Sequence, residues 1–140
     1  MKRILLALAI AGASLATLSS CTKEYITNNN SLPGVSYVYP VKSSQWVRIN
    51  GTNTYEYRQN ITDLDDRYFQ DGHVSVAISY DNNKTTYEII PATIADYDYS
   101  ANYSIGVVRI FAEDIGTGNT VNPPEDMYIK VVLTDTEVGN

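Results

Sequence analysis

The chain has 140 residues, enough for one domain and too few for two of ordinary size. Its 44% of hydrophobic residues favours a folded core, and its net charge of -6 argues against nucleic acid as a partner, because that binding depends on basic side chains. One Cys and one His exclude a disulfide framework, a Cys/His zinc site and a multi-histidine catalytic centre.

The first twenty residues have the pattern of a secretory signal peptide. Lys2 and Arg3 precede an apolar run over residues 4–11, and small and polar residues follow. The run falls within the ~7–15 residues of a signal peptide's apolar region. It is shorter than the ~20 residues that a membrane-spanning helix needs.

The signal ends in Leu18-Ser19-Ser20-Cys21, which resembles the lipobox of bacterial lipoproteins. The thiolate of a cysteine is the nucleophile best suited to accept a diacylglyceryl group. We therefore expect residues 1–20 to be a signal peptide and Cys21 to carry a lipid that attaches the protein to a membrane. Residues 21–34 are polar and turn-forming, which indicates a flexible tether, and residues 35–140 should form the folded domain.

Alternating apolar and polar residues predict β-strands throughout the folded domain. In chain order the expected strands cover residues 35–39, 46–49, 54–59, 74–80, 85–90, 97–100, 104–111 and 128–134. Residues 81–84 should form the hairpin loop between two of them. In the last strand we expect Ile129, Val131 and Leu133 to point inward. These features predict an antiparallel β-sandwich of the immunoglobulin-like kind, with about seven or eight strands.

Two stretches are less regular. In the strand over residues 104–111, Gly106 suggests a bulge or a close approach of another backbone segment, and either Val108 with Ile110 or Val107 with Phe111 could face inward. Residues 63–69 predict one helical turn, with Thr62 or Asp63 as its N-cap.

The overall layout resembles small lipoproteins of unknown function from the Bacteroidetes. The matching features are the lipobox, a strand that holds Trp46, the sequence Asp-Gly-His-Val-Ser-Val over residues 71–76, and a Val/Ile-rich strand over 129–133. Lys23 and Glu24 also resemble the surface-export signal of such lipoproteins, although Tyr25 stands in place of its second acid. The resemblance implies an outer-membrane lipoprotein of the cell envelope, with display on the cell surface as one option, and it implies no catalytic residues.

Tyrosine supplies 12 aromatic residues, against two Phe and one Trp. A tyrosine ring offers a flat apolar face and a hydroxyl, which suit recognition of a glycan or a protein. The candidate ligand-binding residues are Trp46, Tyr55, Tyr57, Tyr97 and Tyr99. The alternative is that these aromatics pack in the sandwich, since Tyr favours strands and Trp46 could be a core residue.

Acidic residues provide the remaining candidates. Calcium binds several converging oxygens, which makes Asp63, Asp65, Asp66 and Asp71 a candidate structural calcium site; the alternative is a solvated acidic turn. No other cofactor is expected. Asp96 and Asp98 should share one face of a strand, and paired carboxylates can hydrolyse glycosides when held on facing elements. His73 has no nucleophile motif around it, which indicates a structural residue.

These observations favour a non-enzymatic, lipid-anchored binding or adhesion module. Two alternatives remain: a structural envelope lipoprotein without a specific ligand, and a small glycoside hydrolase. An exposed aromatic patch would favour binding, tyrosines buried in the core would favour a structural role, and a pocket with two converging carboxylates would favour hydrolysis.

Overall fold

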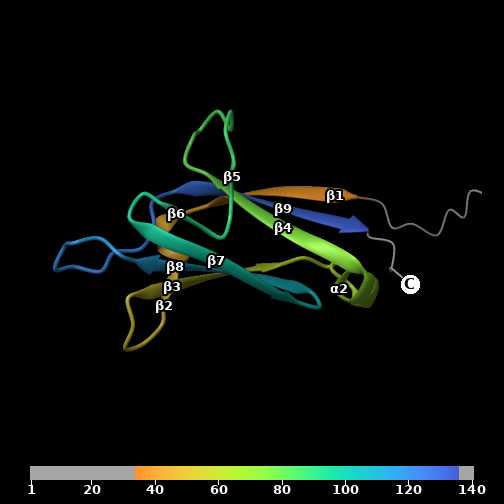
Figure 1. Ribbon diagram of the computed structural model, residues 1–140, viewed down its shortest axis with the longest axis horizontal. Coiled ribbons are helices and arrows are strands. Elements are labelled where there is room, and N and C mark those ends of the chain that lie inside the picture. The colour runs from red at the N-terminus through yellow and green to blue at the C-terminus, as the bar shows by residue number, and fades with distance from the viewer. Residues whose placement is uncertain (1–33, 136–140) are drawn as a thin grey trace, which may run out of the picture.

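The computed structural model describes residues 34–135, which form two antiparallel sheets packed face to face (Figure 1). The β-sandwich expected from the sequence is confirmed. The first sheet has the order β1-β9-β4-β5, with strands β1 (Val35–Val41), β9 (Met127–Asp135), β4 (Gly72–Ser79) and β5 (Glu88–Ile89). The second has the order β2-β3-β8-β7-β6, with β2 (Val47–Arg48), β3 (Thr54–Asn60), β8 (Val107–Asp114), β7 (Tyr97–Ser104) and β6 (Ala92–Ile94).

Side chains from both inner faces form the core, because alternate residues of a strand point to opposite faces of its sheet. Ile129, Val131 and Leu133 of β9 are fully buried, as the alternation predicts. From the opposite sheet, Val108 and Ile110 of β8 are equally buried, so this pair faces inward and Val107 with Phe111 faces outward.

Of the two interpretations of Gly106, the bulge is wrong, and the close approach of another backbone segment is confirmed. Ser104 of β7 pairs with Val107 of β8, so Gly106 lies in the tight turn between two strands, with φ of +78°. Glycine suits this turn because it has no Cβ to clash at positive φ. The turn is held against the preceding loop, since the Gly106 amide donates to the Leu64 carbonyl at 2.7 Å and the Ile61 amide donates to the Gly106 carbonyl at 2.9 Å.

The strand expected over residues 85–90 is shorter than predicted: only Glu88 and Ile89 pair with β4. The segment before it lies instead over the outer face of the first sheet. Lys84 sits 4.3 Å from the ring centre of Tyr128, and Lys130 sits 5.3 Å from that of Tyr87. These cation–π contacts hold residues 84–87 over β9 and so compete with strand pairing to β4. The alternation of residues 85–90 does not reveal this competition, because it carries no information about distant partners.

Two short helices interrupt the strands: the 3₁₀ turn η1 (Ser43–Gln45) and α2 (Asp66–Asp71). The N-cap of α2 is Asp65, and not Thr62 or Asp63 as expected. One carboxylate oxygen of Asp65 accepts from the amides of Arg67 at 3.0 Å and Tyr68 at 3.2 Å. Helix formation starts later than predicted because Leu64 is drawn into the core, where it is fully buried.

Replacing Asp65 with alanine should lower the free energy of unfolding by about 1 kcal/mol, because two helix amides lose their acceptor. Urea denaturation followed by Trp46 fluorescence measures the loss. Asp66→Ala is the matched control: Asp66 lies one residue further on and accepts from the exposed Gln70 side chain at 2.8 Å, whereas the amides of Arg67 and Tyr68 donate to Asp65. Equal destabilisation by both substitutions would contradict the capping role of Asp65.

The sandwich has two distinct ends. β1 starts, β9 finishes and β4 starts at the end where α2 lies, since Val35 and Val74 both pair with Leu133 (Figure 1). Strands of seven to nine residues place the opposite end about 20–30 Å away. Among the described residues, no helix has the length and apolar character that crossing a membrane requires.

Candidate functional site

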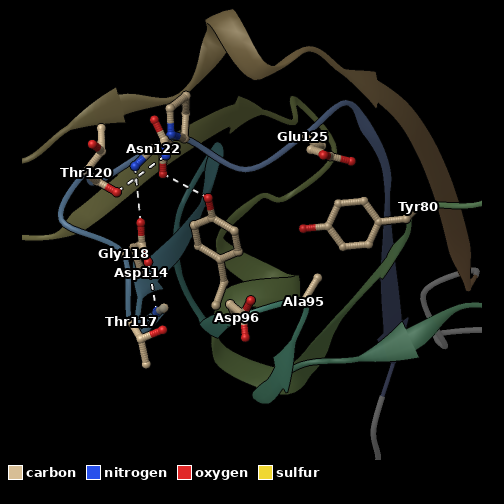
Figure 2. Close-up of a pocket in the computed structure, with 12 residues that line it drawn as sticks. Tyr80, Ala95, Asp96, Asp114, Thr117, Gly118, Thr120, Asn122 and Glu125 are labelled. Carbon is tan, nitrogen blue, oxygen red and sulfur yellow. Dashed lines mark hydrogen bonds between the residues drawn. The ribbon is translucent and has the colours of Figure 1, made fainter.

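A cavity of about 790 Å³ opens at the end of the sandwich opposite α2 (Figure 2). We call it the end cleft. Three connections build it: the residue that follows β4, the turn between β6 and β7, and the segment between β8 and β9. The residues that define it are Tyr80, Ala95, Asp96, Tyr97, Asp114, Gly116, Thr117, Gly118, Thr120, Asn122, Pro123 and Glu125.

One wall of the end cleft is the two-residue turn between β6 and β7. Ala95 and Asp96 both adopt positive φ, at 49° and 64°. Positive φ at both central residues is the geometry that matches the twist of a hairpin. The Asp96 carbonyl accepts from the Ile115 amide at 3.0 Å, which ties this turn to the segment after β8.

The opposite wall is the segment over residues 115–122, and hydrogen bonds hold it in place. The Asp114 carboxylate accepts from the amides of Gly116 at 2.9 Å and Asn122 at 3.1 Å. The Tyr97 hydroxyl donates to the Asn122 carbonyl at 2.9 Å, and the Tyr55 hydroxyl donates to the Val121 carbonyl at 3.0 Å. Core strands thus position this wall through their own side chains, so the cleft is preformed.

Tyr80 and Tyr97 form the floor of the end cleft, and the buried Tyr99 contacts both of them. The hydroxyls of Tyr80 and Tyr99 are hydrogen-bonded, and Tyr99 is only 2% exposed. Burial, together with the charge of Asp114, raises the pKa of Tyr97 to about 12. Burial also raises the pKa of Tyr99, and the hydrogen bond to Tyr80 adds to it. Burial raises the pKa of Tyr80 as well.

These raised pKa values predict alkaline sensitivity. An unfolded tyrosine titrates near pH 10. Because the folded protein holds the protons of Tyr97 and Tyr99 more tightly, their stabilising contribution is complete below about pH 10 and is lost as the pH rises toward and beyond 12. Urea denaturation at a series of pH values should show stability falling in this window. Tyr97→Phe should make the fall shallower, and a stability that stays constant up to pH 12 would contradict the prediction.

The end cleft is acidic. The side chains of Asp96 and Glu125 are exposed at its rim, and neither carboxylate accepts a hydrogen bond from any residue in the described range. Asp114 adds a third acid, engaged by the two amides described above. No Lys, Arg or His belongs to the residues that line the cleft.

The aromatic candidates have different positions from those expected of an exposed face. Tyr55, Tyr57, Tyr99 and Trp46 are all buried, and only Tyr97 reaches the end cleft. The Trp46 ring centre lies 5.8 Å from that of Tyr57 and 6.3 Å from that of Tyr99. Four of the five candidates are therefore core residues with no free ring face to offer a ligand.

Asp96 and Asp98 do not form the expected pair on one strand face. Asp96 lies in the turn, and Asp98 lies in β7, where it accepts a hydrogen bond from the Thr93 hydroxyl. Sequence reasoning also missed Tyr80 and Glu125 as site residues. Tyr80 is the last residue of a predicted strand, and Glu125 follows a Pro-Pro pair, but neither pattern indicates that the two lie at one cleft.

The acidic candidates for calcium do not converge. Within residues 34–135, no three side chains of His, Cys, Asp or Glu lie close enough together to hold a metal ion. Asp65 caps α2, Asp66 accepts from Gln70, and Asp63 accepts from the Tyr37 hydroxyl. Asp71, the fourth candidate, is the last residue of α2.

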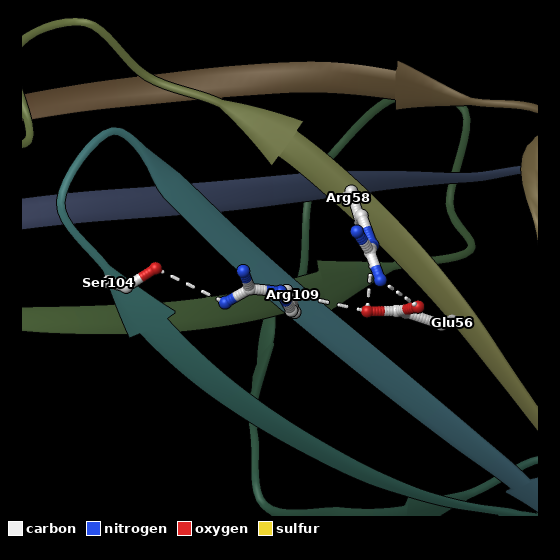
Figure 3. A network of polar contacts seen from close by, with 4 residues as sticks. All are labelled: Glu56, Arg58, Ser104 and Arg109. Carbon is white, nitrogen blue, oxygen red and sulfur yellow. Dashed lines mark hydrogen bonds and ion pairs between the residues drawn. The ribbon is translucent and has the colours of Figure 1, made fainter.

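A charged network lies on the outer face of the second sheet (Figure 3). Arg58 and Arg109 are directly opposite each other in the pairing of β3 with β8. Glu56 accepts from Arg58 at 2.9 and 3.0 Å and lies 3.8 Å from the Nε of Arg109. The Nη1 of Arg109 donates to the Ser104 hydroxyl at 3.2 Å. These contacts relieve the repulsion between two like charges, so the network has a structural explanation.

The fold and the end cleft together define a β-sandwich with a preformed, acidic, tyrosine-floored site built from its loops. Comparisons with protein-family models, with curated proteins and with solved structures find no match to this chain.

Proposed function

We propose that this protein is a lipid-anchored component of the bacterial cell envelope whose β-sandwich is a non-catalytic binding module. The lipobox that ends at Cys21 supports the anchor and an outer-membrane location. Cys21 and the tether that follows it lie outside the described residues. The ligand would be a glycan or a protein, met at the surface of the envelope.

The end cleft is the main structural support for a binding function. Its volume of about 790 Å³ falls within the ~300–1,000 Å³ of typical ligand sites. Its walls are held by core tyrosines and by Asp114, so a ligand would not have to order them. Preorganisation of this kind lowers the entropic cost of binding.

The placement of the end cleft agrees with an anchored binding module. The chain enters β1 at Val35, at the end of the sandwich that holds α2, and the cleft lies at the other end. A lipid on Cys21 would therefore hold the domain by the end opposite the cleft. The cleft would face away from the membrane, toward ligands that approach from outside.

A structural role without a specific ligand is the second candidate. It is favoured by the burial of Trp46, Tyr55, Tyr57 and Tyr99, which removes four of the five candidate aromatic residues from the surface. The two candidates differ in whether the end cleft has an occupant.

Anchoring and orientation can be tested together on intact cells. A lipidated Cys21 has no free thiol, so a cysteine introduced at the cleft, Thr117→Cys, is the only one that a membrane-impermeant maleimide can label. Gln70→Cys on α2 is the matched variant at the other end. Surface display with the proposed orientation predicts labelling of Thr117→Cys on intact cells, at least as fast as that of Gln70→Cys.

Loss of the anchor is the control for this experiment. Cys21→Ala should move the protein out of the membrane fraction. Labelling of Thr117→Cys only after lysis would place the domain inside the envelope and contradict display. Retention of Cys21→Ala in the membrane fraction would contradict the lipid anchor.

A further inference from the structure

We propose that the end cleft recognises a basic segment of a partner protein and takes an arginine side chain between Asp96 and Glu125. This inference rests on the proposed binding function and names the chemistry of its ligand. It draws on the geometry of the two carboxylates, the tyrosines between them and the absence of any cationic residue among those that line the cleft.

The two carboxylates come from separate walls of the end cleft. Asp96 belongs to the turn between β6 and β7, and Glu125 lies in the segment that leads into β9. Figure 2 shows them on different sides of the cavity, with the Tyr80 hydroxyl directed into the space between. A cationic group that enters this space would face an acid on either side.

The charge of the end cleft is uncompensated. Asp126, another exposed carboxylate, has a cationic partner in Lys42 at 2.8 Å. Asp96 and Glu125 have no such ion pair among the described residues. A bound cation would gain from both carboxylates, whereas an anionic ligand would be repelled.

Hydrogen-bonding capacity also favours a cation over a sugar. A sugar hydroxyl pairs with donors as well as acceptors, and two amides of the lining, those of Gly116 and Asn122, already donate to Asp114. The charged groups that remain, Asp96 and Glu125, are acceptors only. A guanidinium carries five N–H donors and no acceptor, so it complements this lining.

Arginine fits better than lysine because its planar guanidinium can pair with a carboxylate through two parallel hydrogen bonds. The same plane can stack on an aromatic ring, and Tyr97 supplies a half-buried ring in the cleft. Asp96, Glu125 and Tyr97 are thus the residues assigned to ligand recognition.

Binding of short peptides to the full lipidated protein in neutral detergent micelles tests the inference. The probe is an Arg-Gly-Arg peptide with blocked ends, and its matched control has citrulline, which keeps the shape of arginine without the charge. Fluorescence anisotropy should show the arginine peptide bound at least about tenfold more tightly. Asp96→Asn and Glu125→Gln should each weaken that binding about tenfold.

A remote substitution controls for the overall acidity of the chain. Asp66→Asn removes the same charge at α2, the end of the sandwich opposite the cleft, and should leave peptide binding unchanged. If Asp66→Asn and Glu125→Gln lowered the affinity for the arginine peptide equally, the binding would be nonspecific charge attraction, and the inference would be overturned. Equal affinity for the citrulline peptide would also overturn it.

Oligosaccharides separate this inference from the proposed binding function. Oligomers of glucosamine and of N-acetylglucosamine are measured alongside the peptides. If either binds more tightly than the arginine peptide, and Tyr97→Ala abolishes that binding, the partner class is wrong but the cleft remains a binding site. If the arginine peptide does not bind at millimolar concentration, the inference fails whatever the sugars do.

Discussion

Replacing Trp46 with alanine should lower the free energy of unfolding by about 3–5 kcal/mol, the range found when a buried Trp or Phe is truncated. The Trp46 side chain is 5% exposed and packs between the rings of Tyr57 and Tyr99. Its removal would leave a cavity where the two sheets meet and would remove a packing contact from Tyr99, which in turn bonds to Tyr80 of the end cleft. Thermal and urea denaturation, followed by far-ultraviolet circular dichroism, measure the loss.

Trp46→Phe is the matched variant, because it keeps an aromatic ring in the same place. The Nε1 of Trp46 is buried and has no hydrogen-bond partner among the described residues. Phenylalanine removes this unsatisfied donor, which offsets part of the packing that it loses, so we expect a loss of less than about 1.5 kcal/mol. If Trp46→Ala instead left stability unchanged and abolished ligand binding, Trp46 would be a surface binding residue.

Replacing Ile129 with alanine should cost about 2–5 kcal/mol of stability. Ile129 is fully buried in β9, the central strand that pairs with β1 on one side and β4 on the other. The surrounding side chains belong to two paired sheets, so they can collapse only in part into the space that the substitution leaves. Urea denaturation with Trp46 fluorescence as the signal measures the change.

Val132→Ala, on the same strand, is the control for Ile129→Ala. Val132 points to the outer face of the sheet and is half-buried. Its truncation should cost less than about 1 kcal/mol, because most of the removed surface is already partly in water. Similar losses from the two variants would contradict the assignment of the faces of β9.

The positions of the most regular strands and their inward faces were predictable from the sequence, whereas β6 (Ala92–Ile94) was not predicted. The alternation over residues 128–134 identifies Ile129, Val131 and Leu133 as core residues, and all three are fully buried. This signal is local: one buried face imposes a period of two on the sequence of the strand itself. The same alternation left the face of residues 107–111 open, because both faces of β8 carry apolar residues.

The candidate site was predicted less well, because its residues are remote in the sequence. Tyr80, Asp96 and Glu125 belong to three separate connections, and only the strand order brings them to one end of the sandwich. The aromatic pattern identified Tyr97 but could not separate it from Tyr99, two residues further along the same strand. Tyr99 is buried on Trp46, whereas Tyr97 lies at the cleft.

The sequence by itself determined that the chain forms alternating strands and which side chains of the strongest strands turn inward, because both depend on neighbours two residues apart. Tertiary structure alone decided that Gly106 makes a turn, that Asp65 caps α2 and that Trp46 belongs to the core. Each of these outcomes depends on contacts between segments distant in the sequence, such as the hydrogen bonds between Gly106 and residues 61–64. Which distant segments meet depends on how whole strands pair, and the pattern of residues within one strand does not specify that pairing.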